Sequence, residues 1–117
     1  MGQKILVVGY DESTPKVVKR FLKMQGYDAR IAENNQAALD ILNDEKFNVI
    51  IIDDVKEALG EELIAELAKR LDLNIQQIIY MSSYPRSDNL PKQVIFFSKM
   101  KLGLEEIVNF VKKKEDQ

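Results

Sequence analysis

Short apolar runs alternate along this chain with segments in which apolar residues recur at helical spacing. Nearly continuous apolar runs are typical of strands covered on both faces, whereas alternation of apolar and polar residues is typical of a half-exposed edge strand. We predict strands over residues 5–8, 27–31, 49–52, 78–81 and 94–97. The alternating run 27–31 is expected at an edge of the sheet, and the run 49–52 in its middle.

Segments of helical period separate or follow these strands, within residues 14–25, 38–42, 59–71 and 104–111. The first helix is expected to begin at Thr14 and Pro15, because proline suits the first helical turn, and to end at Gly26. Strands that alternate with helices predict an α/β fold with parallel strands and crossover helices. Residues 83–91 contain two prolines and several turn formers, so we expect a loop or a single turn there instead of a full helix.

Composition and charge narrow the possible functions. A chain of 117 residues is expected to form one domain, 1–117, with a buried core. Cysteine and histidine are absent, so any chemistry depends on carboxylates, hydroxyls and lysines, and we expect no enzyme. A net charge of −2 gives no overall field to hold nucleic acid. No stretch is long enough for a membrane span and no signal peptide precedes the first strand, so we expect a cytoplasmic protein.

Reactive side chains follow three of the predicted strands. Asp53 comes directly after the central run, Ser82 ends the fourth strand, and Lys99 follows the fifth. The carboxyl ends of parallel strands meet at one edge of a sheet, where ligands bind in α/β proteins. An acid, a hydroxyl and an ammonium group are therefore expected in one small site, beside Gly9-Tyr10 at the end of the first strand.

These residues resemble the receiver domains of bacterial two-component response regulators. The similarity covers nearly the whole chain and is carried by residues 4–8, 26–27, 32–34, 38–39 and 49–53, with Ser82 and Lys99. It implies a flavodoxin-like fold, which is a doubly wound five-stranded parallel sheet of strand order 2-1-3-4-5. The fourth helix of that fold is expected to be reduced or missing here, because the segment 83–91 is too short and too rich in proline.

The resemblance also implies a role for each candidate site residue. Asp53 matches the aspartate that accepts a phosphoryl group from a sensor histidine kinase or a phosphotransfer protein. Ser82 matches the switch hydroxyl, Lys99 the lysine that pairs with the phosphoryl group, and Phe96 an aromatic rotamer switch. Phosphorylation would then change a surface that contacts a downstream output protein or domain.

Phosphoryl transfer to a carboxylate requires positive charge around the transferred group, which Mg²⁺ normally supplies. By analogy with the family, the metal ligands here include Asp53 and the Val55 carbonyl, together with two acids after the first strand. Those two positions fall on Gly9 and Tyr10, neither of which is a suitable ligand. Asp53 alone would bind Mg²⁺ weakly, unless the nearby Asp11 turns inward and replaces the lost pair.

A second departure concerns the residue after Lys99. The family has a proline in a cis peptide bond at that point, whereas this chain has Met100. A cis bond before a residue other than proline costs about 2.5–4 kcal/mol, so we expect a trans bond and a displaced Lys99 ammonium group.

Three other readings stay open. The chain can be a pseudo-receiver, which has lost phosphorylation and serves as a protein-interaction module. A nucleotide-binding loop at Gly9 is disfavoured, because a phosphate cradle needs more small residues and the following Asp11 and Glu12 would repel an anion. In the third reading the candidate residues have no functional role: Asp53 is a loop acid, Ser82 a strand-end hydroxyl and Lys99 a solvated lysine.

Overall fold

The computed structural model describes residues 3–54, 59–71, 76–82, 88–98 and 104–115. Its centre is a five-stranded sheet in which every pair of neighbouring strands is parallel. The strands are β1 (Lys4–Gly9), β2 (Asp28–Ala32), β3 (Val49–Asp54), β4 (Gln77–Ser82) and β5 (Ile95–Ser98). Their order is β2-β1-β3-β4-β5, which confirms the predicted topology and places the alternating strand β2 at an edge.

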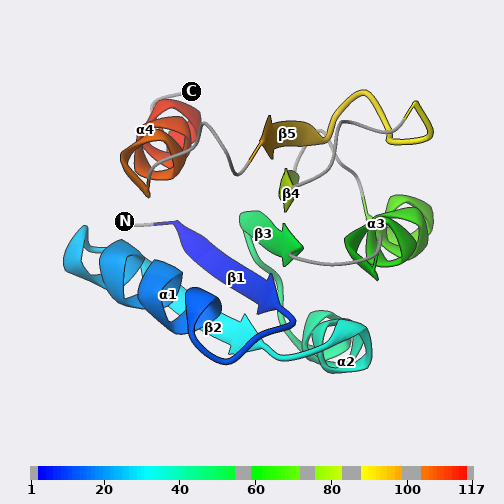
Figure 1. Cartoon of the computed structure of the whole chain (residues 1–117), viewed down its shortest axis with the longest axis horizontal. Helices are drawn as coiled ribbons and strands as arrows, with labels where there is room; N and C mark the ends of the chain where they lie inside the picture. Colours follow the sequence, from blue (N-terminus) through cyan, green and yellow to red (C-terminus); the bar gives the residue numbers. More distant parts are fainter. Residues whose placement is uncertain (1–2, 55–58, 72–75, 83–87, 99–103, 116–117) are drawn as a thin grey trace.

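Helices cover both faces of the sheet (Figure 1). They are α1 (Thr14–Met24), α2 (Asn35–Asp44), α3 (Leu59–Arg70) and α4 (Leu104–Glu115). Side chains of α1 and α4 share one hydrophobic core with the sheet, and those of α2 and α3 share the other. The doubly wound arrangement predicted from the sequence is therefore confirmed.

Local sequence signals account for several helix ends. Pro15 lies in the first turn of α1, where its missing N–H costs no helical hydrogen bond. Gly26 follows α1 with a φ of +91°, a conformation that glycine adopts readily. Asn34 caps α2, because its side-chain oxygen accepts a hydrogen bond of 2.7 Å from the Ala37 N–H.

The central strand β3 is buried along its whole length, including its two terminal acids. Its apolar residues alternate between the two cores, with Ile50 and Ile52 on the α2–α3 side and Val49 and Ile51 on the α1–α4 side. This alternation sends the side chains of the following Asp53 and Asp54 toward opposite faces of the sheet.

The connection between β4 and β5 differs from a regular crossover. Its described part, residues 88–94, contains turns and no helix, and Leu90 and Val94 contribute to the core on the α2–α3 side. Among all the described residues, no helix is both long and apolar enough to cross a membrane.

Candidate functional site

Two predicted site residues lie at the carboxyl edge of the sheet, on neighbouring strands. Asp53 is paired in register with Gly9 of β1 and with Met81 of β4, and Ser82 is paired with Asp54. The side chain of Asp53 has no exposed surface and that of Ser82 is 2% exposed. The fold thus brings this acid and this hydroxyl to the same edge, where both are enclosed, but the register and the strand alternation place Ser82 on the face of Asp54 and not on that of Asp53.

The other predicted site residues are only partly covered by the structure. Phe96 is half-buried, and its ring lies edge-on to Tyr80 with 6.0 Å between ring centroids. Lys99, Met100 and Val55 lie outside the described residues. The predicted roles of the lysine, of the trans bond that follows it and of the Val55 carbonyl stay predictions.

Gly9 occupies the first position at which the family has an acid, and its surroundings leave no room for a side chain. A Cβ atom built on Gly9 would lie 2.0 Å from Cγ of Pro15. The Pro15 ring is buried in the first turn of α1 and fills the space beside the end of β1. An aspartate cannot replace Gly9 unless this turn moves.

Tyr10 occupies the second position, where its hydroxyl is committed to a hydrogen bond. It donates to Oδ1 of Asn35 at 2.6 Å, and Nδ2 of Asn35 donates to the Leu59 carbonyl at 2.9 Å. Burial raises the pKa of the Tyr10 hydroxyl, and the negative charges of Asp54 and Glu62 raise this pKa further. The phenol therefore stays neutral and links the end of β1 to the first turns of α2 and α3.

Asp11, the proposed substitute for the lost acids, interacts with the start of α1. Its Oδ2 accepts a hydrogen bond of 2.8 Å from the Thr14 hydroxyl and a longer one, 3.4 Å, from the Thr14 N–H. The structure thus gives this oxygen a helix-capping role. A metal-binding role for Asp11 stays a prediction.

The sequence reasoning missed the role of Asp54. Its Oδ2 accepts hydrogen bonds from the Tyr80 hydroxyl at 2.7 Å and from the Gly60 N–H at 2.9 Å. Burial raises the pKa of Tyr80, and so does the hydrogen bond to Asp54. Tyr80, two residues before Ser82, was the available signal, because a buried tyrosine hydroxyl normally has a partner.

The residues present do not fit a receiver-type Mg²⁺ site. One acid position is a glycine packed against Pro15, and the other is a neutral tyrosine bonded to Asn35. Within the described ranges, no three acidic side chains come close enough together to hold a metal ion. Asp53 is the single member of the family's acidic set that is present at its expected position.

The sequence matches no protein-family model and no curated protein. Solved structures are similar to it over nearly their whole length. The Francisella response regulator 1452 receiver domain is 23% identical, with a TM-score of 0.80, over 99% of this chain and 100% of that one. A CheY-like response regulator receiver domain protein from Methanospirillum hungatei is 22% identical, with a TM-score of 0.78, over 99% of this chain and 95% of that one.

A third similar structure contains a bound phosphoryl mimic. It is the response regulator protein TrrA from Thermotoga maritima in complex with Mg²⁺-BeF, and it is 25% identical with a TM-score of 0.72, over 93% of this chain and 98% of that one. The strand order, the two helical layers and these likenesses agree with one another. The chain therefore has the fold of the receiver domains of response regulators.

Proposed function

We propose that this chain is a receiver-type protein-interaction domain of a cytoplasmic signalling system, and that it binds its partner without Mg²⁺-dependent phosphorylation of Asp53. The observation that carries the proposal is the filling of both positions at which a receiver holds its metal-binding acids. Pro15 packs against Gly9, and Asn35 accepts a hydrogen bond from Tyr10. The domain acts by binding and not by catalysis.

The chemistry of phosphoryl transfer supports this proposal. An attacking carboxylate must approach a negatively charged donor, and the developing charge needs cations or donors around it. A metal that is bound by Asp53 without further acids would be held weakly. The carboxylate of Asp53 is also fully buried, so a donor has no direct access to it in this conformation.

Phosphoryl acceptance at Asp53 is the second candidate function. It is favoured by the arrangement of Asp53 and Ser82 at the same sheet edge and by the receiver fold, of which TrrA has been solved with Mg²⁺-BeF. A sensor histidine kinase or a phosphotransfer protein would be the donor, and a downstream output protein or domain would read the change.

Incubation with Mg²⁺ and the small phosphoryl donor acetyl phosphate distinguishes the two functions. Intact-mass spectrometry is expected to find no added phosphoryl group. An added group that is lost in the Asp53→Asn variant would overturn the proposal and establish the second candidate.

A gain-of-function variant tests the physical reason for the proposal. The triple change Gly9→Asp, Tyr10→Asp and Pro15→Ala restores both acids and removes the ring that blocks the first of them. Once circular dichroism shows that this variant is folded, it is expected to acquire a phosphoryl group that the parent chain does not. A folded variant that accepts no phosphoryl group would show that the absence of the two acids is not the reason why the parent chain is not phosphorylated.

A further inference from the structure

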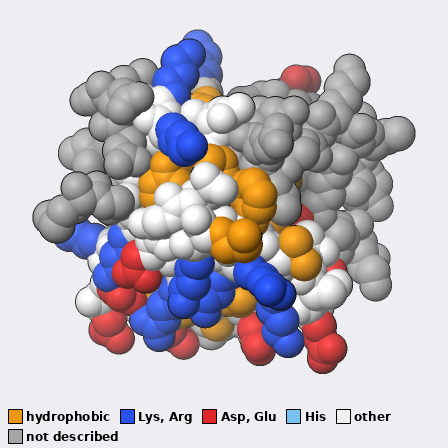
Figure 2. Space-filling model, turned by 90° about the vertical axis from the view of Figure 1, so that its left-hand side faces the viewer, with side chains coloured by type: hydrophobic (Ala, Val, Ile, Leu, Met, Phe, Trp, Pro, Cys, Tyr) orange, Lys and Arg blue, Asp and Glu red, His pale blue; other side chains and the backbone are white. Residues whose placement is uncertain are grey.

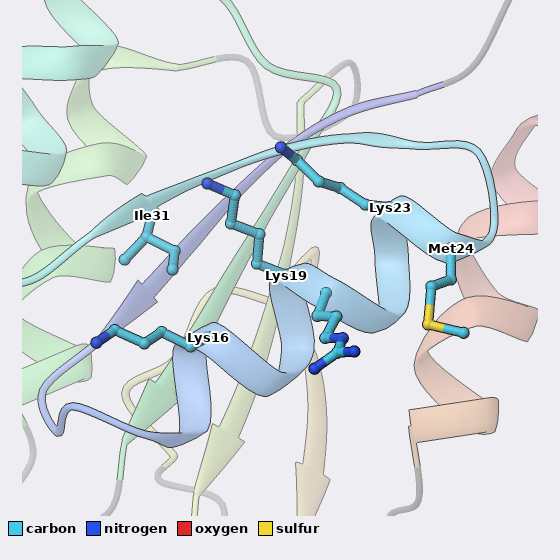
Figure 3. Close-up of a pocket in the computed structure, with 6 residues that line it drawn as sticks. Lys16, Lys19, Lys23, Met24 and Ile31 are labelled. Atoms are coloured by element: carbon cyan, nitrogen blue, oxygen red, sulfur yellow. The ribbon is translucent and has the colours of Figure 1, made fainter.

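A surface groove runs along the side of α1 that faces the edge strand β2. It has a volume of about 540 Å³ and is lined by Lys16, Lys19, Arg20, Lys23 and Met24 of α1 and by Ile31 of β2. Figure 3 shows Lys16, Lys19 and Lys23 extending from α1 on the side of Ile31. The groove is therefore basic along the helix and apolar at the strand.

Helix α1 carries positive charge without an acid of its own. The helix has four basic residues and no acidic residue, although the whole chain has a net charge of −2. Among the described residues, the ion pairs involve Lys4, Arg30, Lys69 and Arg70, and none includes a side chain of α1. Figure 2 shows Lys and Arg side chains gathered in its lower half, where α1 lies, next to exposed hydrophobic side chains and with Asp and Glu side chains at the rim.

The apolar part of the groove consists of one residue from the helix and one from the strand. Met24 of α1 is 73% exposed. Ile31 is half-buried where the groove meets β2. A methionine side chain adapts its shape to an apolar partner, and removing it from water favours binding.

The spacing of the three lysines favours a helical partner over an extended strand. Lys16, Lys19 and Lys23 are three and four residues apart, so their positions repeat about every 5.4 Å along the helix axis. A partner helix that lies alongside α1 presents carboxylates with the same repeat, whereas same-face side chains of a strand repeat about every 6.6 Å. Carboxylates of a helix can therefore face all three lysines in turn.

We infer that this groove binds an acidic amphipathic helix of a partner protein, with glutamates against Lys16, Lys19 and Lys23 and separate apolar side chains against Ile31 and against Met24, which lie at different ends of the groove (Figure 3). The inference rests on the proposed function, because it names the kind of partner that the interaction domain takes. Helices that bind in grooves commonly use such apolar anchors at helical spacing.

Nucleic acid and anionic membrane fit the groove less well. Both are extended polyanions, and the part of the chain outside α1 is net acidic and would repel them. Only a narrow acidic segment can reach the lysines while it avoids the acidic remainder of the surface. The apolar residues Met24 and Ile31 also contribute nothing to binding a phosphate backbone.

The test uses the whole chain and a synthetic helical peptide that carries a stripe of glutamates beside a stripe of leucines. We expect saturable binding by fluorescence anisotropy, weakened by added salt, and amide NMR shifts centred on α1 and Ile31. A peptide with glutamine in place of glutamate is expected to bind at least about tenfold more weakly.

Matched variants locate the site. The charge reversal Lys19→Glu with Lys23→Glu is expected to weaken binding of the glutamate peptide at least about tenfold. Reversal of the exposed Lys46 and Lys92 changes the net charge equally, lies away from the groove and is expected to leave affinity nearly unchanged. The change Met24→Ser is expected to weaken binding a few-fold without affecting the fold.

Three results would overturn the inference: no saturable binding of the glutamate peptide, equal weakening by the two charge reversals, or tighter binding of a DNA duplex or of phosphatidylserine vesicles. The proposed function fails separately, through phosphorylation of Asp53, which this titration does not measure. If the domain neither accepts a phosphoryl group nor binds the acidic peptide, the inference about the groove is wrong and the proposed function stands.

Discussion

The two acids at the end of β3 are neighbours in sequence and have opposite environments. Asp53 faces the α1–α4 side, where the receiver chemistry is expected and where Pro15 fills the space beside Gly9. Asp54 faces the α2–α3 side, where it accepts hydrogen bonds from Tyr80 and Gly60. The carboxyl edge thus has a buried acid next to close backbone packing on one face and a buried hydrogen-bonded acid on the other.

Two hydrogen-bond networks connect the strands at this edge to the helices. The Asp54 network joins the ends of β3 and β4 to the first turn of α3, and the Tyr10 network joins the end of β1 to α2 and α3. The hydrogen bonds of Asp54 are buried, so breaking one of them leaves its partner unsatisfied in the core, whereas those of Tyr10 and Asn35 are only partly buried or exposed.

The largest predicted effect comes from removing Asp54. The change Asp54→Ala leaves the Tyr80 hydroxyl and the Gly60 N–H without this acceptor, at a cost of about 3 kcal/mol or more in the free energy of unfolding. Urea denaturation measures this value. A loss below about 1 kcal/mol would mean that the network does not stabilise the edge.

The next largest effect tests the packing of Pro15 against Gly9, on the α1–α4 face of the sheet. The change Gly9→Ala forces a Cβ atom against the Pro15 ring and is expected to cost about 2 kcal/mol. Pro15→Ala removes the obstacle, so the double variant should be more stable than the sum of the single changes predicts. Additive effects in this double-mutant cycle would show that Pro15 does not exclude a side chain at position 9.

Removing one tyrosine hydroxyl from each network compares how much the two networks contribute to the free energy of unfolding. Tyr80→Phe takes one hydrogen bond from a buried carboxylate and is expected to cost about 2 kcal/mol, whereas Tyr10→Phe takes one from a neutral amide and should cost about 1 kcal/mol. Thermal or urea unfolding of the two variants side by side provides the measurement. The reverse order would contradict the view that Asp54 is the stronger acceptor.

A half-buried carboxylate at the surface, that of Glu45, provides the smallest effect and a reference for the fully buried ones. Hydrogen bonds from Lys4 and Arg30 lower the pKa of Glu45, and the charges of these two residues act in the same direction. Because its pKa is lowered on folding, the stability from Glu45 is fully present above its unfolded pKa of about 4.5 and is lost as the pH falls through the folded value.

The pH dependence of Glu45→Gln checks this point. Compared with the parent chain, the variant is expected to be slightly less stable at neutral pH and to lose less stability on acidification, as followed by urea midpoints between neutral and acidic pH. Parallel curves for the two proteins would show that the ion pairs of Glu45 contribute nothing measurable.

The sequence predicted the architecture well, because apolar runs and helical spacing depend on burial alone. The continuous run before Asp53 became the central strand β3, and the alternating run that ends at Ile31 became the edge strand β2. The sequence also predicted that Gly9 and Tyr10 fall where the resemblance implies the receiver acids, and this assignment stays a prediction. Of the segment 83–91, where a loop or a single turn was predicted, residues 83–87 lie outside the described residues and residues 88–91 contain turns and no helix.

The contacts that fill the site could not be predicted in the same way. The packing of Pro15 on Gly9 depends on the path of a short loop, for which the sequence has no periodic signal. The partners of Asp54 come from β4 and α3, and only the three-dimensional register brings Tyr80 and Gly60 to it. Adjacent acids at a strand end point to opposite faces, so the sequence alone did not show which one had acquired a structural role.

The most direct test of the central claim is a titration with Mg²⁺ followed by beryllofluoride, a phosphoryl mimic, observed by backbone amide NMR. We predict an unchanged spectrum at millimolar Mg²⁺ with and without the mimic, in both the parent chain and the Asp53→Asn control. Saturable shifts around Asp53 and Ser82 that vanish in the control would contradict the account and establish a working phosphorylation switch.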